Sequence, residues 1–324
     1  MKIFILHPYK TLGDWNMRLK KQTEMMGERC EIKILHKKIG LIEGLDHNTV
    51  NDILKQIEEF KPDLLYVSGF LLERITRLAK VPYVYDFGSF VSRNLLIQQT
   101  GKNIKELLEM PEREITSLIE KIRIVDYYHK EKLILEGAGS IISWDSDEIE
   151  LARVLFGDDI HKKIKPISMM FSELPKPIPF EKKKSAVIAI APKWGDKEKN
   201  LGLLHKVEKE CSIEKIGHGT NLKYLKHAPL MDRLNNSKVL FCPYQAGGCG
   251  VVSEGLRLGC NVVVIDYFPF KAYINKELIT TEKRAVQTIK RALERYYPPN
   301  ITISTQQEQM NKILKECEKV AKNK

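Results

Sequence analysis

Long apolar runs are missing from this 324-residue sequence. The four apolar residues that follow Lys2 are far fewer than a signal-peptide core requires, and no later stretch approaches the roughly 18 apolar residues of a membrane-spanning helix. Hydrophobic residues make up 43% of the chain and charged residues 29%, which is the balance of a folded globular protein. We therefore expect a folded, cytoplasmic protein.

Cysteine is scarce and is not arranged for metal or disulfide chemistry. The six cysteines form no CxxC pair and lack the histidine spacing of a zinc site. We expect buried thiols at all six positions: Cys30, Cys211, Cys242, Cys249, Cys260 and Cys317.

Several nucleotide-binding and hydrolase signatures are also absent. The pattern GxGxxG followed by an acid about 20 residues later is missing, which disfavours a dinucleotide-dependent dehydrogenase. The P-loop pattern GxxxxGKS/T is missing too, which excludes a P-loop NTPase. No Ser-His-Asp or Cys-His order indicates a hydrolase.

Acidic residues are outnumbered. The chain has 53 Lys and Arg residues against 42 Asp and Glu residues, a net charge of +11. This balance favours anionic partners, namely nucleotides, nucleic acid or an acidic membrane surface, and does not choose among them. The lysine-rich stretches at 19–22, 36–38, 161–165 and 181–184 fit solvated basic faces equally well.

Strand-like apolar runs alternate with helical periodicity along most of the chain. Strands are expected at residues 2–6, 31–35, 63–67, 82–86, 140–144, 186–190, 213–217, 238–243 and 261–266. Helices are expected from about residues 14, 49 and 200, near 230, and at 71–79, 104–136 and 282–296. The alternation predicts parallel sheets with crossover helices.

The chain length and a proline-rich stretch indicate two domains. Pro175, Pro177 and Pro179 follow one another closely without helical periodicity, as in a linker. We predict an α/β fold with two Rossmann-like domains facing a cleft. The expected boundaries are a first domain at 1–168, a linker at 169–185, a second domain at 186–302 and a C-terminal helix at 303–324.

The C-terminal segment STQQEQMNKILKECEKVAKNK begins with a Ser/Thr cap and is amphipathic. Its apolar face consists of Met310, Ile313, Leu314, Cys317 and Val320. We expect this helix to cross back and brace the first domain. A basic amphipathic helix lying on an anionic membrane is the alternative.

Glycine is concentrated in AGGCGVVSEGLRLGCNVVVID, residues 246–266. The segment follows an expected strand, and its first glycines precede a short helix. In this arrangement the unpaired backbone N–H groups and the positive end of the helix dipole bind phosphate. Gly247, Gly248 and Gly250 would let a ligand approach the main chain closely. A plain tight turn is the alternative.

The longer stretch VLFCPYQAGGCGVVSEGLRLGCNVVVID, residues 239–266, resembles the nucleotide-sugar segment of retaining glycosyltransferases of the GT4 family, which have the GT-B fold. The matching positions occur in the family's order: Pro243, Gly248, Gly250, Glu254, Gly259 and the strand 262–264. The stretches AVIAIAPKWGDKEKNLGLL, IEKIGHGTNLKYL and APLMDRLNNSKVLFCP extend the resemblance over nearly all of the second half. The first half agrees in layout only.

The resemblance implies a UDP- or GDP-linked sugar as the donor substrate, with no resident cofactor and no metal. The family's Arg and Lys that hold the leaving diphosphate fall on Lys193 and Lys199, with Lys197 a close competitor. Glu254 would accept hydrogen bonds from the ribose hydroxyls, and a helix-first-turn acid is the alternative. The other donor-binding candidates are Gly217, His218, Gly219, Gln245, Gly247, Gly248, Cys249, Gly250 and Val251.

The sequence departs from the family at two places. The family's second acid, eight residues before the Glu254 position, is replaced by Ala246, beside which Gln245 could bind sugar hydroxyls. In PYVYDFGSF the family's histidine is missing, and Asp86 is the candidate catalytic residue on the sugar or acceptor side, with strand-end capping as the alternative. Gly13, after the first strand, is a candidate for close approach to donor or acceptor, or a plain turn.

The expected function is therefore sugar transfer from a nucleoside diphosphate sugar, with retention of configuration. One alternative is a nucleotide-sugar epimerase on the same fold, which the scarcity of acids and histidine disfavours. The other is a nucleotide-binding protein that has lost activity, which Ala246 suggests. The acceptor stays open among a glycan, a lipid and DNA. The basic composition also fits a peripheral contact with the anionic cytoplasmic face of a membrane.

Overall fold

The computed structural model describes twelve stretches of the chain: residues 1–7, 14–36, 45–69, 72–86, 91–143, 146–167, 173–193, 200–218, 225–244, 249–268, 271–301 and 304–323. The chain forms two compact units. The first comprises residues 1–96, 110–171 and 305–324, and the second comprises residues 97–109 and 172–304. Each unit contains one parallel sheet with helices, as the alternation of apolar runs predicts.

The first unit is built on a six-stranded sheet with the order β2-β1-β3-β4-β5-β6. All neighbouring strands are parallel. The strands are β1 (Lys2–His7), β2 (Glu31–His36), β3 (Leu64–Val67), β4 (Tyr83–Asp86), β5 (Ser140–Ser143) and β6 (Ile164–Pro166). Every residue of β3, β4 and β5 is buried, because parallel strands are covered on both faces.

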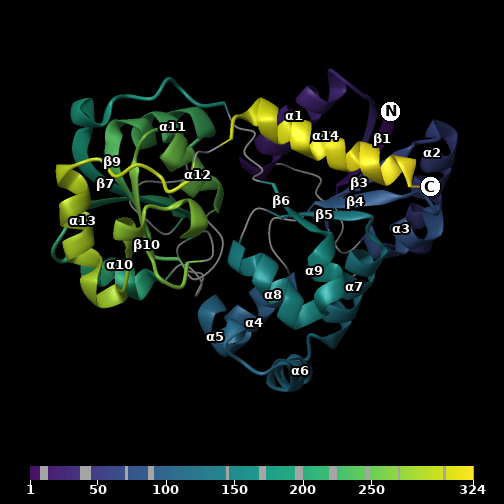
Figure 1. Ribbon diagram of the computed structural model, residues 1–324, viewed down its shortest axis with the longest axis horizontal. Coiled ribbons are helices and arrows are strands. Elements are labelled where there is room, and N and C mark those ends of the chain that lie inside the picture. Colours follow the sequence, from purple (N-terminus) through teal and green to yellow (C-terminus); the bar gives the residue numbers. More distant parts are fainter. Residues whose placement is uncertain are drawn as a thin grey trace. The chain divides into compact units, whose positions relative to one another are not determined.

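Helices surround this sheet (Figure 1). In chain order they are α1 (Asp14–Gly27), α2 (His47–Phe60), α3 (Glu73–Ala79), α4 (Val91–Thr100), α6 (Glu112–Lys121), α7 (Val125–Gly137), α8 (Ser146–Phe156), α9 (Asp158–Lys163) and α14 (Gln306–Lys322). The boundary between the units falls within α4, because residues 97–109 belong to the second unit, together with the short helix α5 (Ile104–Leu108).

The prediction of one long helix over 104–136 is wrong. This stretch contains α5, α6 and α7, and α4 precedes them without having been predicted. Pro111 is the N-cap residue of α6, where its missing N–H does no harm. Arg123, between α6 and α7, has a φ of 59°, so the chain leaves the right-handed helical conformation there.

The second unit has a five-stranded sheet with the order β11-β10-β9-β7-β8, also parallel throughout. Its strands are β7 (Lys184–Lys193), β8 (Ile213–His218), β9 (Ser237–Cys242), β10 (Asn261–Ile265) and β11 (Ile279–Thr280). Its other helices are α10 (Leu201–Glu208), α11 (His227–Asn236), α12 (Cys249–Arg257) and α13 (Ala285–Glu294), with short 3₁₀ turns η2 (Phe180–Lys182), η4 (Lys271–Tyr273), η5 (Lys276–Leu278) and η6 (Glu282–Arg284). Figure 1 shows α11 and α12 on one face of this sheet and α13 on the other.

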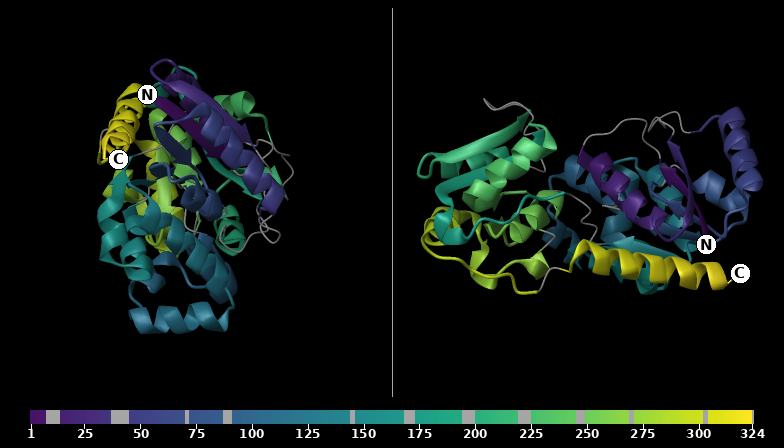
Figure 2. Two further views of the ribbon diagram at one scale, coloured as in Figure 1. Left: turned by 90° about the vertical axis from the view of Figure 1, so that its right-hand side faces the viewer. Right: turned by 90° about the horizontal axis from the view of Figure 1, so that it is seen from above.

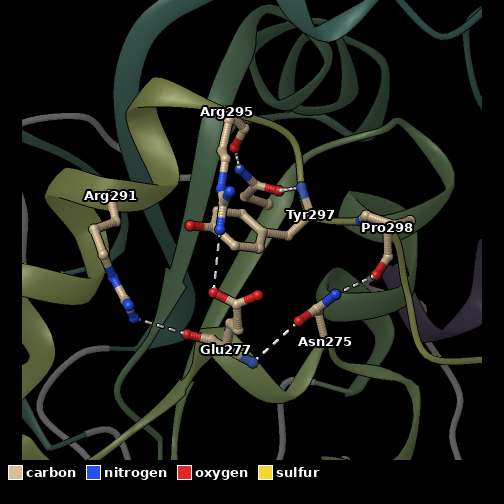
Figure 3. A network of polar contacts seen from close by, with 7 residues as sticks. Asn275, Glu277, Arg291, Arg295, Tyr297 and Pro298 are labelled. Carbon is tan, nitrogen blue, oxygen red and sulfur yellow. Dashed lines mark hydrogen bonds and ion pairs between the residues drawn. The ribbon is translucent and has the colours of Figure 1, made fainter.

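A buried asparagine fixes the chain after α13. Asn261, at the start of β10, donates from Nδ2 to the carbonyl oxygens of Ala292 (2.6 Å) and Arg295 (2.7 Å), and its Oδ1 accepts from the Tyr297 N–H (2.8 Å). Figure 3 shows the surrounding contacts, in which Arg295 lies over the Tyr297 ring and pairs with Glu277 at 3.3 Å. Three backbone groups inside the unit are thereby satisfied.

Helix α14 completes the first unit, as the sequence predicts. Thr305 and Glu308 form a capping box at its start. Its predicted apolar face is buried and contacts β3, β4 and β5, and α1 packs beside it (Figures 1 and 2). Ser140 Oγ also donates to Glu316 Oε2 at 3.0 Å. Since the sheet covers this apolar face, the same face does not lie on a membrane in this structure.

Gly139, directly before β5, makes room for α14. A Cβ atom at Gly139 would lie 2.7 Å from Val320 Cγ1 and 3.1 Å from Cγ2, so rotation of the valine gives no relief. We expect Gly139→Ala to lower the free energy of unfolding, measured in urea, by about 1–3 kcal/mol.

Two further variants identify the cause. Val320→Ala removes both methyl groups that the new side chain would meet, so the double variant should be destabilised by less than the sum of the two single variants. Additive effects would contradict the contact. Gly202→Ala is the control, because a Cβ there meets nothing within 4 Å, and it should leave stability unchanged or slightly raised.

Candidate functional site

The carboxyl ends of β7, β8 and β9 lie at one edge of the second sheet, because the strands are parallel. The chain passes from β7 to β8 on one side and then to β9 on the other, so strand order reverses at β7. In open parallel sheets, ligands bind at the carboxyl edge beside such a reversal. This edge is therefore the candidate site.

The structure brings several predicted residues to this edge. Lys193 is the last residue of β7 and is the Cα partner of His218, the last residue of β8, after a register shift that follows Ile190. Gly217, one residue earlier in β8, is buried and has a φ of 135°, a conformation that favours glycine. For Lys193 and His218 the structure gives the place in the strand only.

Helix α12 begins at Cys249, after β9, which is where the glycine segment predicts a helix to start. Gly250 is buried and Val251 half-buried in its first turn. Gly255 lies close to the sheet, since a Cβ there would be 2.8 Å from Leu240 Cδ2 and 3.3 Å from Val262 Cγ2. The helix is thus held against β9 and β10.

Glu254 lies in the second turn of α12 and is 2% exposed. The alternative interpretation of Glu254 as a first-turn acid is therefore wrong. Its Oε1 lies 3.4 Å from Nε2 of His227, the first residue of α11, and both side chains are buried. Arg257, one turn further along α12, donates from Nη2 to the Ser304 carbonyl oxygen at 2.7 Å. Burial lowers the pKa of Arg257, and the nearby Glu254 opposes that shift.

His227 is a partner of Glu254 that the sequence analysis missed. The available signal was its place at the start of the helix in HAPLMDRLNNSKVLFCP, directly before β9. Its contact with Glu254 joins residues 27 positions apart, so no local pattern reveals it.

Asn200, which directly follows the candidate Lys199, is fixed by a polar cluster. It has a left-handed backbone with a φ of 51° and caps α10, its side chain accepting from the Leu203 N–H. Its Nδ2 donates to the Tyr267 hydroxyl at 2.6 Å and to Glu282 Oε1 at 3.2 Å, and the same hydroxyl donates to Glu282 at 2.8 Å. Burial, reinforced by Glu282, raises the pKa of Tyr267.

The other predicted site residues lie outside the described residues, and their roles stay predictions. They are Gly13, Lys197, Lys199, Gly219, Gln245, Gly247 and Gly248, together with the substituted position Ala246. Cys249 is placed as the first residue of α12, with nothing described of its side chain.

Asp86 ends β4 in the first unit and belongs to a buried polar cluster. Its Oδ2 accepts from the Tyr66 hydroxyl and from Gln22 Nε2 (3.5 Å), while Gln22 also donates to the Tyr66 oxygen at 2.7 Å. Cys317 of α14 interacts electrostatically with the Tyr66 hydroxyl and with the Asp86 carboxyl. Oδ1 of Asp86 has no hydrogen-bond partner among the described residues. Burial raises the pKa of Asp86 to about 7, against the two hydrogen bonds, which lower it.

This cluster bears on the predicted role of Asp86. The side chain is 2% exposed and its partners come from β3, α1 and α14 rather than from solvent. The catalytic role of Asp86 stays a prediction, and the role that its contacts define is that of a buried acid.

The described part of the chain holds no group of three or more His, Cys, Asp or Glu side chains placed to bind a metal ion. None of its helices has the length and apolarity needed to cross a membrane.

Comparisons with known proteins identify the fold. No family model and no curated protein sequence matches the chain. Among solved structures, sucrose-phosphate synthase from Thermosynechococcus elongatus is 10% identical, with 99% of this chain and 94% of that chain covered and a TM-score of 0.62. Anabaena HepE in complex with UDP and glucose is 13% identical, with 100% and 95% covered and a TM-score of 0.61.

A third structure comes from a different class of enzyme. UDP-GlcNAc 2-epimerase from Neisseria meningitidis, bound to UDP-GlcNAc, is 11% identical, with 98% of this chain and all of that chain covered and a TM-score of 0.56. At these identities the likeness shows the fold alone. The chain therefore has the GT-B-type fold of two parallel α/β parts, and its membership of the GT4 family stays a prediction.

Proposed function

We propose that the protein is a glycosyltransferase that moves a sugar from a UDP- or GDP-linked donor to an acceptor. The observation that carries the proposal is the buried Glu254 carboxylate in α12, beside the carboxyl edge of the second sheet. The GT-B-type fold supports it, since HepE is in complex with UDP and glucose, and the epimerase is bound to UDP-GlcNAc.

The donor is held through its nucleoside diphosphate. The start of α12 supplies backbone N–H groups to the diphosphate, and Lys193 and Lys199, or Lys197 in place of Lys199, supply ammonium groups. Glu254 accepts hydrogen bonds from the ribose hydroxyls. Because cations of the chain balance the diphosphate charge, transfer requires no metal and no resident cofactor.

In the transfer step, the bond between the anomeric carbon and the diphosphate oxygen breaks, and its electron pair stays on the diphosphate. The acceptor oxygen bonds to the anomeric carbon on the same face, so configuration is retained. Its proton passes to a diphosphate oxygen. Asp86 stands as the candidate for the sugar or acceptor side, and the acceptor is a glycan, a lipid or DNA.

Calorimetric titration with UDP and GDP tests the donor site. We expect Glu254→Ala and Lys199→Ala each to weaken binding of the preferred diphosphate at least tenfold, because each removes a charged partner. Lys206→Ala, which removes an exposed lysine from α10, is the matched control and should leave affinity unchanged. Unchanged affinity in both site variants would exclude this donor site. Mass spectrometry of what stays bound from a mixture of nucleotide sugars then identifies the donor.

The epimerase has the same type of fold, so nucleotide-sugar epimerisation is the alternative function to be tested. Incubation with the bound nucleotide sugar and no acceptor separates the two activities, because an epimerase yields an isomeric nucleotide sugar, whereas a transferase yields slow hydrolysis at most. If nucleotide binds and no donor–acceptor pair turns over, the replacement at Ala246 indicates a binding protein that has lost activity.

The acceptor class has its own tests. DNA binding that falls steeply with added salt would favour DNA, because phosphate contacts release counterions. Co-sedimentation with anionic but not neutral vesicles would favour a lipid acceptor and a peripheral membrane contact.

A further inference from the structure

The buried histidine at the start of α11 has no part in the donor site as proposed so far. His227 is 7% exposed, and its Nε2 lies 3.4 Å from Oε1 of Glu254. Helices α11 and α12 contact each other, so the two residues face one another across a helix pair. A polar ring in such a place costs free energy unless it is hydrogen-bonded, and among the described residues the Glu254 carboxylate is an acceptor within reach.

We propose that His227 is a positioning residue that orients the Glu254 carboxylate toward the ribose of the donor, an inference that rests on the proposed function. Nε2–H donates to the carboxylate in the charged imidazole and in the neutral tautomer that carries its proton on Nε2. The hydrogen bond restricts the rotamers of a glutamate side chain. Less conformational entropy is then lost when the carboxylate accepts the ribose hydroxyls.

The packing of α12 supports this role. The close approach of Gly255 to Leu240 and Val262 holds the helix backbone against the sheet, so the remaining freedom of Glu254 is in its side chain. The hydrogen bond from His227 restricts the rotamers of that side chain. The position of the histidine is itself fixed, because α11 packs on β7 and β9.

The test compares the nucleoside diphosphate that the protein binds with its 2′-deoxy form, using the full chain and calorimetry. Wild-type protein should bind the ribose form at least tenfold more tightly. His227→Met, of similar size but without an N–H donor, should reduce that preference to about threefold or less. His227→Gln, which keeps a donor at a similar reach, should preserve it. A purely structural histidine would change both affinities equally and leave the ratio unchanged.

The outcomes separate this inference from the proposed function. A preference that is unchanged in His227→Met, while Glu254→Ala still abolishes it, overturns the positioning role and leaves the donor site intact. Wild-type protein that binds neither UDP nor GDP overturns the proposed function itself. If His227→Met does not fold by circular dichroism, His227→Asn replaces it, because its shorter amide does not reach Glu254 and the same loss of preference is expected.

Discussion

Replacing Asp86 with asparagine is expected to stabilise the folded protein above neutral pH. Burial raises the pKa of Asp86 to about 7, whereas an aspartate in the unfolded chain titrates near its ordinary value of 3.8. Between these two pH values the folded state binds more protons than the unfolded state. The contribution of Asp86 to stability is therefore greatest in acid and is lost as the pH rises toward 7.

The asparagine variant lacks this loss. Urea unfolding of both proteins between pH 5 and pH 8 should show the variant gaining about 2–3 kcal/mol relative to wild type over that range. The amide oxygen of the variant would still accept a hydrogen bond from the Tyr66 hydroxyl. Asp52→Asn, which changes an exposed carboxyl on α2, is the control and should show no such trend. A difference between variant and wild type that does not change with pH would contradict the raised pKa.

The same variant addresses the proposed catalytic role. A carboxyl that is kept buried at a cost to stability is a common sign of function. If Asp86 acts on the sugar or acceptor side, Asp86→Asn should raise stability at pH 8 and sharply lower turnover. A variant that is both more stable and fully active would limit Asp86 to the buried cluster.

Asn261→Asp is expected to have the largest effect on stability. The change is nearly isosteric, but it replaces an amide N–H₂ that donates to two carbonyl oxygens by a carboxylate oxygen that repels them. The site is fully buried. We expect the free energy of unfolding of the second unit to fall by roughly 3–5 kcal/mol, measured in urea at pH 7.

A second asparagine of the same region provides the control (Figure 3). Asn275 donates to the Pro298 carbonyl oxygen at 2.8 Å and accepts from the Glu277 N–H at 3.0 Å, but it is only half-buried. Asn275→Asp should cost less than about 1 kcal/mol, because water solvates the new charge. Equal losses in the two variants would mean that burial of Asn261 is not the cause.

Much of the fold could be predicted from the sequence because parallel strands are buried on both faces. The apolar runs of β3, β9 and β10 identify strands directly, and the stripe on α14 predicts a helix that packs on a sheet. The separate helices between residues 91 and 137 were harder to predict from the sequence. Apolar periodicity continues across the breaks, and the left-handed conformation of Arg123 has no local sequence signal.

The candidate site, too, was only partly predictable from the sequence. Glu254 and the start of α12 were found from sequence, because the glycines, the helix and the acid are neighbours in the chain. His227 and the cluster around Asp86 were not, since those contacts join residues from separate elements. Tertiary contacts of this kind depend on how helices pack, which the spacing of residues in one segment does not encode.

The discontinuity of the first unit has a consequence for its biosynthesis. Its sheet is made early, but α14, which covers β3, β4 and β5, leaves the ribosome only after the whole of residues 172–304. At ordinary translation speeds that delay is on the order of ten seconds. The nascent sheet must wait with an uncovered apolar face, so this unit depends on chaperones or on rapid folding of the intervening residues more than a contiguous domain would.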